Sequence, residues 1–216
     1  MAVNKSDIAK LREQTGAGML DCKKALDEVN GDYDGAIDYL RKRGIAKAAK
    51  RASKVASEGT VASYIHSNGK IGVLLELNSE TDFVAKNDMF INLVDDITMH
   101  IAAVAPSYVS RDEVPTELVE KEKEIYRVQL ANEGKPEDII EKILEGKLNK
   151  YFGEICLLEQ KYIKDEDKTV EQLLTEKTAE IGEKLTVRRF TRYVLGEGIE
   201  KSTKNFAEEV EEQLQK

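Results

Sequence analysis

Apolar residues recur at helical spacing through the first 44 residues, and glycine-containing breaks divide them into three stripes. Gly16-Ala17-Gly18 ends the first stripe, Asn30-Gly31 ends the second, and Gly44 ends the third. The stripes comprise Ile8 and Leu11; Met19, Cys22, either Ala25 or Leu26, and Val29; and Ala36, Ile37 and Leu40. Residues 5–44 are therefore predicted to form a compact three-helix unit, followed by a basic linker at residues 45–56.

The period then changes from 3.6 to 2, which is typical of strands. Residues 58–66 and 70–78 are predicted to form a hairpin, because Asn68-Gly69 is a strong signal for a tight turn. Counting outward from this turn pairs Tyr64 with Val73, Ala62 with Leu75 and Thr60 with Leu77. One face of the hairpin is expected to be buried, and it carries Tyr64, Val73, Leu75 and Leu77.

A helix is predicted after the hairpin, beginning with the capping-box pattern Ser79-Glu80-Thr81-Asp82 and running to about Val104. Its apolar side chains form one stripe, so it is expected to lie across the hairpin. The stripe comprises Phe90, Leu93, Val94, Ile97, Ile101 and Val104.

Further elements follow in the second half of the chain. Pro115 and Pro136 are placed at the first position of two helices, 115–133 and 136–152, and the break at Gly134 makes these antiparallel neighbours. A helix at about 169–181 is expected to lead into a third strand, Leu185 to Leu195, with a bulge. Residues 205–215 are predicted to form a short acidic helix that carries Phe206, Val210 and Leu214 on one side.

Composition favours helix, since the 216 residues include only three prolines and fourteen glycines and 34% of them are charged. The chain carries a net charge of −8, yet residues 1–56 hold twelve basic and eight acidic side chains, so the larger remainder is acidic. This asymmetry argues against general nucleic-acid binding by that remainder. Residues 41–54 hold seven basic and no acidic side chains, which allows RNA or ribosome contact. The absence of interleaved aromatic residues favours a solvated surface instead.

The sequence carries no signal for a catalytic centre, a cofactor or a metal site. The Gly-Lys pairs that begin at Gly69, Gly134 and Gly146 are never followed by Ser or Thr, as a phosphate-binding loop requires. Cys22 and Cys156 lie far apart with no metal-ligand spacing, and the chain has only two histidines. No apolar run approaches a membrane span or a secretion signal, so a cytoplasmic, non-enzymatic protein that binds a protein partner is expected.

Two segments resemble a known family. Leu-Arg-Glu-Gln-Thr-Gly-Ala-Gly-Met-Leu-Asp-Cys-Lys-Lys-Ala-Leu at 11–26 and Ser-Glu-Thr-Asp-Phe-Val-Ala-Lys-Asn at 79–87 are similar to the two signatures of translation elongation factor Ts, in the same order. The similarity covers nearly the whole chain. It continues through Met99-His100-Ile101-Ala102, Gly134-Lys135-Pro136, Ile181-Gly182-Glu183 and Val187-Arg188-Arg189-Phe190.

The resemblance implies a guanine-nucleotide exchange factor for elongation factor Tu, with Asp82 and Phe83 as an intruding pair near the Mg²⁺ site of that GTPase. The contact residues that it implies are Arg12, Met19, Thr81, Asp82, Phe83, Val84, His100, Ile181 and Gly182. Structural roles are the alternatives: a helix cap for Asp82, a core aromatic for Phe83, a buried histidine for His100, and a helix end at Ile181-Gly182.

The elements predicted along the chain together give an α+β fold with three parts. These are a three-helix, partner-binding domain with its linker at 1–56, which is similar to ubiquitin-associated domains, an exchange core of a small antiparallel sheet packed with helices at 57–198, and a helical module at 199–216. Longer family members carry a second hairpin subdomain and a coiled-coil insertion. This chain is expected to have one hairpin and no insertion, so a homodimer is the further expectation.

An alternative function follows from the likeness to ubiquitin-associated domains. The three-helix unit could bind ubiquitin-like or nascent chains through its Gly16-Ala17-Gly18-Met19 loop, as an adaptor does. A pull-down from a bacterial lysate separates the two functions, because an adaptor retains many clients and an exchange factor retains one dominant GTPase.

Overall fold

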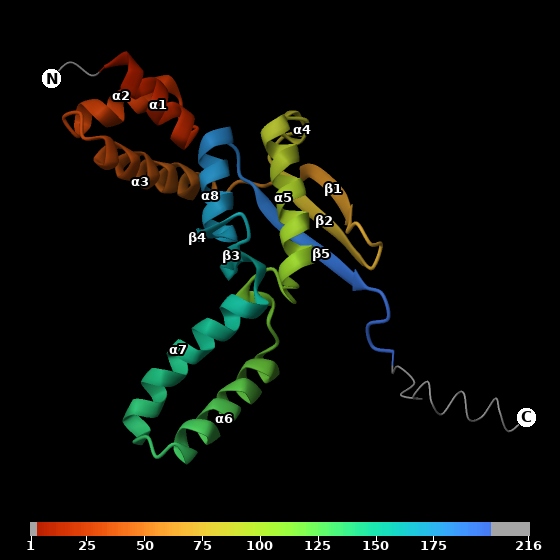
Figure 1. Cartoon of the computed structure of the whole chain (residues 1–216). Helices are drawn as coiled ribbons and strands as arrows, with labels where there is room; N and C mark the ends of the chain where they lie inside the picture. Colours follow the sequence, from red (N-terminus) through yellow and green to blue (C-terminus); the bar gives the residue numbers. More distant parts are fainter. Residues whose placement is uncertain (1–3, 200–216) are drawn as a thin grey trace, which may run out of the picture.

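The computed structural model describes residues 4–199, apart from the side chain of Asp138, and Figure 1 shows a helical unit, a central body and a projecting arm. The predicted helix at 205–215 and, except for Ile199, the module at 199–216 lie outside the described residues. Helices and a small antiparallel sheet together give the α+β class that the sequence predicted. The proposed division into domains stays a prediction.

The N-terminal unit has three helices, α1 (Lys5–Thr15), α2 (Met19–Glu28) and α3 (Tyr33–Arg51). Gly16 has φ of 66° and closes α1 in the left-handed conformation that glycine adopts without strain. The three helices enclose their own small core, separate from that of the body. Its buried members are Ile8, Leu11, Cys22, Ala25, Leu26 and Ala36.

Helix α3 continues past Gly44 to Arg51, so the prediction that it ends at Gly44 and gives way to a basic linker is wrong. A glycine inside a helix costs only ~1 kcal/mol, and the Arg, Lys and Ala residues around it are strong helix formers. Gly44 also lies against helix α8 (Val170–Ile181), where a Cβ at position 44 would sit 3.4 Å from that of Ala179. The absence of a side chain therefore lets α3 pack closely on the body.

The sheet has the order β1-β2-β5 and is antiparallel, with strands β1 (Glu58–Ile65), β2 (Ile71–Ser79) and β5 (Thr186–Val194). The predicted hairpin register is confirmed, since Tyr64 pairs with Val73, Ala62 with Leu75 and Thr60 with Leu77. The predicted bulge is confirmed too. Leu77 pairs with Val187 but Glu76 pairs with Arg189, which leaves Arg188 as the extra residue of β5.

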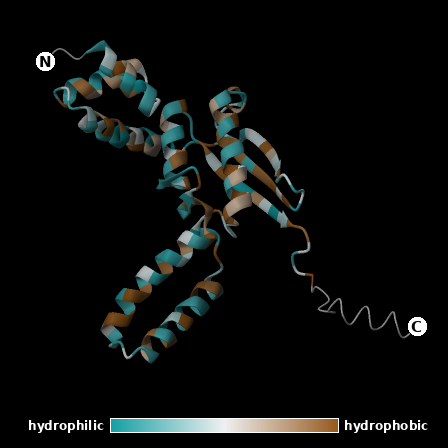
Figure 2. Cartoon of the chain, in the orientation of Figure 1, coloured by the Kyte–Doolittle hydropathy of each residue, from teal (hydrophilic) through white to brown (hydrophobic). Residues whose placement is uncertain are grey.

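Helix α5 (Asp88–Val104) lies across one face of the sheet and buries the main core against it. Figure 2 shows apolar residues on both the strands and α5. The buried members include Val73, Leu75, Leu77, Phe90, Leu93, Val94, Ile97 and Ile101. Two expected members differ: Tyr64 is half-buried, and Val104 at the end of α5 is exposed.

The predicted continuous helix from Asp82 is interrupted. A one-turn helix, α4 (Asp82–Ala85), ends at Lys86, and Asn87 then starts α5 by accepting a 2.8 Å hydrogen bond from the Met89 N–H. Ser79 does not cap, because its hydroxyl donates to the Thr81 carbonyl instead. The asparagine is the stronger cap, and it gives α4 a direction separate from that of α5.

Helices α6 (Thr116–Asn132) and α7 (Glu137–Ile155) form an arm that projects from the body (Figure 1), and the predicted antiparallel pair of helices is confirmed. The helices begin one residue after Pro115 and Pro136. Few apolar residues of α6 are buried, because the pair packs mainly on itself. At its base the N–H groups of Ser107 and Tyr108 both donate to the Ile155 carbonyl, and these two segments are followed by the short helices η1 (Arg111–Glu113) and η2 (Leu157–Glu159).

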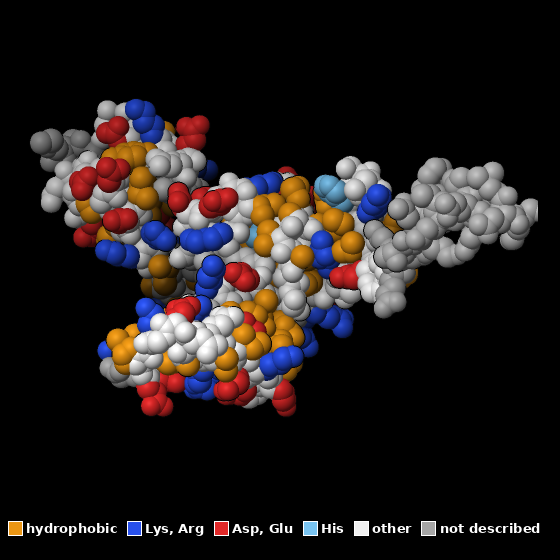
Figure 3. All heavy atoms as spheres, turned by 60° about the horizontal axis from the view of Figure 1, so that its bottom comes forward, with side chains coloured by type: hydrophobic (Ala, Val, Ile, Leu, Met, Phe, Trp, Pro, Cys, Tyr) orange, Lys and Arg blue, Asp and Glu red, His pale blue; other side chains and the backbone are white. Residues whose placement is uncertain are grey.

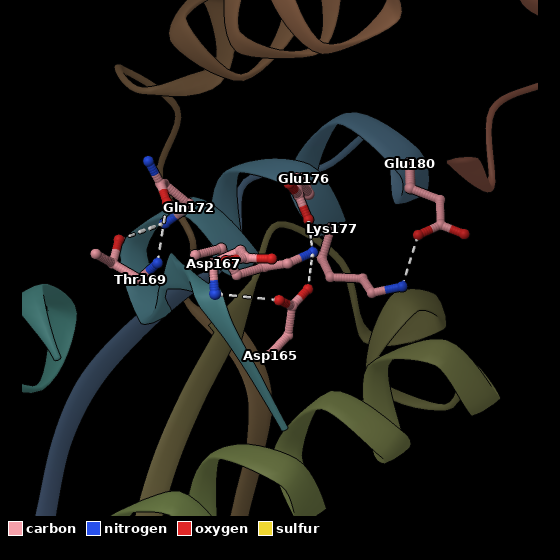
Figure 4. A network of polar contacts seen from close by, with 8 residues as sticks. Asp165, Asp167, Thr169, Gln172, Glu176, Lys177 and Glu180 are labelled. Carbon is pink, nitrogen blue, oxygen red and sulfur yellow. Dashed lines mark hydrogen bonds and ion pairs between the residues drawn. The ribbon is translucent and has the colours of Figure 1, made fainter. Parts of the chain in front are cut away.

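A second hairpin, β3 (Lys161–Tyr162) with β4 (Asp165–Thr169), was not predicted, because β4 is polar and lacks alternation. Polar contacts (Figure 4) add to the packing of Tyr162 on the main core in this region. Lys168 pairs with Asp165 at 3.2 Å and with Glu176 at 2.8 Å. Thr169 and Gln172 form a reciprocal capping box at the start of α8, whose predicted position is confirmed.

Candidate partner-binding site

Phe83 lies on the exposed one-turn helix α4 and is 80% exposed. A single exposed apolar side chain is common on a protein surface, so the exposure shows only that the ring is accessible. Its neighbour Val84 is half-buried and packs on the main core, and this packing holds the turn against the body. The alternative of a core aromatic is therefore wrong for Phe83, and the side chain is available to a partner.

Asp82 occupies the first turn of α4, and Thr81 takes the cap position, so the alternative that Asp82 is the cap is wrong. The Asp82 carboxylate accepts a 2.8 Å hydrogen bond from the ammonium group of Lys86. This bond is the main reason why the pKa of Asp82 lies below its ordinary value. Asp82 thus presents a negative charge beside Phe83 on an exposed surface.

Two carboxylates join this turn to the segment after α8. The Glu183 carboxylate accepts from the Thr81 N–H at 3.0 Å and from the Thr81 hydroxyl at 2.8 Å. In the reverse direction, the Glu80 carboxylate accepts from the Lys184 N–H at 2.7 Å. We call these four residues the clasp. The sequence offered no signal for it beyond the position of Glu183 beside Ile181-Gly182.

The clasp brings two of the predicted contact segments together, residues 81–84 and 181–182. Ile181 is half-buried against the main core, whereas Gly182 is exposed and ends α8 with φ of 88°. Ile181 and Gly182 therefore both have a structural role at the end of α8. It also places an exposed backbone segment close to the turn that carries Phe83.

The clasp also reaches the N-terminal unit. Glu80 pairs with Arg51 at 3.0 Å, and the Lys184 ammonium group donates to the carbonyls of Ala52 and Lys54 just after α3. Two other basic residues of segment 41–54, Arg43 and Lys47, pair with Asp21 of α2. Part of the basic charge predicted as a solvated face is thus used in contacts within the chain.

His100 is fully buried in α5 and does not reach the surface. Its Nδ1 accepts a hydrogen bond from the Ile163 N–H at 3.3 Å, so Nε2 carries the proton and donates to Gln160 Oε1 at 3.0 Å. Both ring nitrogens are satisfied, as the structural alternative requires. Burial lowers the pKa of His100, and the Gln160 bond opposes this shift only in part.

The buried, neutral His100 predicts a pH dependence of stability. The unfolded chain binds a proton near the ordinary pKa of 6.5, but the folded chain does so only at lower pH. The stabilisation is therefore complete above that value and is lost as the pH falls through the folded pKa. Urea unfolding between about pH 7 and about pH 5 should show a falling free energy of unfolding.

Two glutamine variants test this assignment. The His100→Gln protein should lose most of the slope with pH, whatever its absolute stability, because the titrating group is gone. The exposed His66 provides the control, and His66→Gln should keep the slope. An equal slope in the His100→Gln protein and the wild type would show that another group causes the dependence.

Arg12 and Met19 lie on the N-terminal unit, apart from α4 in Figure 1. Arg12 is exposed and Met19 is 45% exposed. The structure also exposes Leu20, at 75%, which the sequence analysis did not single out although it lies off the buried stripe of α2. These residues form a second candidate surface, which is separate from the clasp.

The outer face of the sheet is open and carries exposed apolar side chains together with the ion pair between Glu76 and Arg189. It carries Val61 and Ile65 from β1, Leu74 from β2 and Tyr193 from β5, each between 49% and 68% exposed. Figure 3 shows further hydrophobic side chains gathered on the body and along the arm.

Among the described residues, no helix is long and apolar enough to cross a membrane, and no group of three potential metal ligands occurs.

Comparisons with known proteins agree on one family. The family model described as Elongation factor TS matches residues 45–197. Elongation factor Ts of Acetivibrio thermocellus is 62% identical over 207 residues, and that of Geobacter sulfurreducens is 59% identical over 210 residues. These alignments cover 96% and 97%, respectively, of both chains. Such identity over nearly the whole length shows that the chain belongs to the elongation factor Ts family.

Proposed function

We propose that this protein is a guanine-nucleotide exchange factor that binds elongation factor Tu and promotes release of GDP during translation elongation. The observation that carries the proposal is the exposed Phe83, held on a short turn beside Ile181 and Gly182. The family membership supports a role in translation elongation. The same proposal places the protein in the cytoplasm, where elongation factor Tu works.

The mechanism that we propose is thermodynamic linkage, without a catalytic group of this chain. If the factor binds nucleotide-free Tu more tightly than GDP-bound Tu, GDP must bind the complex more weakly by the same ratio. Phe83 would insert between elements of the GTPase near its Mg²⁺ site and displace them. A single coupling typically reaches ~1–3 kcal/mol, so a large acceleration needs several contacts together. The second surface, at Arg12, Met19 and Leu20, would supply binding energy away from the nucleotide.

Stopped-flow release of a fluorescent GDP analogue from Tu tests this function. Addition of the protein should accelerate release in a saturable manner, and the absence of any acceleration would refute the proposal. Calorimetry of the isolated protein with GDP and GTP should show no saturable binding, because the nucleotide site belongs to Tu.

The adaptor function is not favoured by the family membership, and a lysate pull-down dominated by a single GTPase would exclude it.

We also propose that a second copy of the chain covers the outer face of the sheet. A group of exposed apolar side chains on one face is a frequent site of association, and a two-fold dimer lets the same surface serve both copies. Leu74 lies on the central strand of that face and is 49% exposed, so it should sit near the centre of the contact.

A charge at Leu74 should separate such a dimer. We expect Leu74→Lys to weaken self-association at least about tenfold, equivalent to ~1.4 kcal/mol, because two like charges would meet across the contact. Sedimentation equilibrium measures the effect. Val55→Lys, at a residue that is 80% exposed but lies outside the sheet, should leave association unchanged. A monomeric wild type at micromolar concentration would refute the dimer.

A further inference from the structure

The clasp holds Thr81 by two hydrogen bonds to one carboxylate. The Glu183 carboxylate binds the backbone N–H and the side-chain hydroxyl of the same residue, Thr81, at 3.0 Å and 2.8 Å. Two bonds to one residue fix both its position and its orientation, and hydrogen bonds to an ionised carboxylate are stronger than those between neutral groups. Thr81 is the residue from which α4 starts, two positions before Phe83.

Apart from the clasp, the start of helix α4 is held by the 2.8 Å hydrogen bond from the Ser79 hydroxyl to the Thr81 carbonyl. The helix is a single turn of four residues with no side-chain cap, and none of its residues is fully buried. A helix this short is not stable by its own hydrogen bonds, because nucleation is unfavourable. Its direction is therefore set by the partial packing of Val84 and Ala85 on the core and by the position of Thr81 at its start.

We propose that Glu183 is a positioning residue for Phe83, and that it fixes the turn in the direction that a partner needs. The same segment carries Ile181 and Gly182, so one carboxylate holds two contact segments in a fixed relation although they are about a hundred positions apart in the chain. The reverse bond, from the Lys184 N–H to Glu80 at 2.7 Å, closes the clasp from the other side. This inference rests on the proposed exchange function for its kinetic consequences but not for its structural ones.

A double-mutant cycle on full-length protein tests the inference through the maximal rate of GDP release from Tu. Glu183→Ala should lower that rate about tenfold, while the concentration of factor that gives half the maximal rate changes less than about threefold. In a Phe83→Ala protein the further change Glu183→Ala should cost at most about twofold, because Glu183 acts through Phe83. Additive effects of the two changes would overturn the proposal.

Two variants control for the chemistry. Glu183→Gln should restore most of the rate, because its amide oxygen accepts from the Thr81 N–H and its amide nitrogen donates to the hydroxyl. Glu176→Ala removes a carboxylate from α8 that pairs with Lys168 and lies outside the clasp, and it should leave the rate unchanged. A loss of rate with Glu183→Ala but none with Phe83→Ala would show that Glu183 does not act through Phe83.

Hydrogen exchange in the free protein gives a readout that does not depend on Tu. In the wild type the Thr81 N–H donates to Glu183, and those of Lys86 and Asn87 donate to the Phe83 and Val84 carbonyls; Glu183→Ala should increase exchange at these three amides while α5 and α8 stay protected. Unchanged protection at Thr81, Lys86 and Asn87 would overturn the positioning role. If the wild type fails to accelerate GDP release but the exchange pattern changes as expected, the proposed function falls and the positioning of the turn stands.

Discussion

Replacing Phe83 with alanine is expected to slow the maximal release of GDP from elongation factor Tu by roughly 10- to 100-fold while leaving the protein as stable as the wild type. Burial of a phenylalanine side chain is worth ~1.5–3 kcal/mol, and each ~1.4 kcal/mol of a barrier changes a rate tenfold. That energy is gained only when Phe83 enters the partner, because the side chain is 80% exposed in the free protein. Binding of Tu should fall less than the release rate, since other surfaces still hold it.

Thermal melting and nucleotide-release kinetics on the same preparations distinguish this outcome from a loss of folding. A buried phenylalanine would cost ~3–5 kcal/mol on truncation. Val55→Ala, at a side chain that is equally exposed, is the matched control and should change neither quantity. Asp82→Ala should act mildly, since it removes an exposed ion pair with Lys86. A large loss of stability, or an unchanged release rate, would show that Phe83 is not the wedge.

Gly59→Ala is expected to be strongly destabilising, with a loss of at least ~3 kcal/mol. Gly59 has φ of 129°, a conformation that L side chains rarely adopt. A Cβ at this position would lie 2.2 Å from the Leu77 carbonyl oxygen and 2.7 Å from the Asn78 Cα. Both atoms belong to the backbone of β2, so the strands must separate to make room.

Urea unfolding compares this variant with Gly69→Ala, which changes the other positive-φ glycine of the hairpin. Gly69 has φ of 67° and open space around its Cα, so alanine there should cost only the ~1–2 kcal/mol of the left-handed conformation. The difference between the two losses measures the steric contact with β2. Equal losses in the two variants would mean that the strands adjust without cost.

The hairpin was predictable because its information is local. Asn68-Gly69 sets the turn, and a period of 2 then assigns every pair from Thr60 to Leu77. The same holds for the stripe of α5 and for the bulge in β5, where the apolar alternation slips by one residue at Arg188. In these segments the local preference and the packed structure agree.

The errors arose where distant residues decide the outcome. Gly44 was placed at a helix end because nothing in the local sequence shows that Ala179 lies opposite it. The strand β4 includes Asp165, Glu166, Asp167 and Lys168, which have low strand preference. The ion pair between Lys168 and Glu176 cannot be predicted from the spacing of apolar residues. The clasp joins residues 80–81 to 183–184, which no short pattern connects.

The way in which the arm joins the body bears on how its length can vary. The chain enters and leaves at one point, where the N–H groups of Ser107 and Tyr108 both donate to the Ile155 carbonyl and the Leu157 N–H donates to the Tyr108 carbonyl. If α6 and α7 gain or lose the same number of turns, only the far end of the arm moves. The two backbone segments that join the arm to the body stay the same, and so does the sheet. The fold thus offers a site where one protein lineage can change the reach of the molecule without redesigning its core.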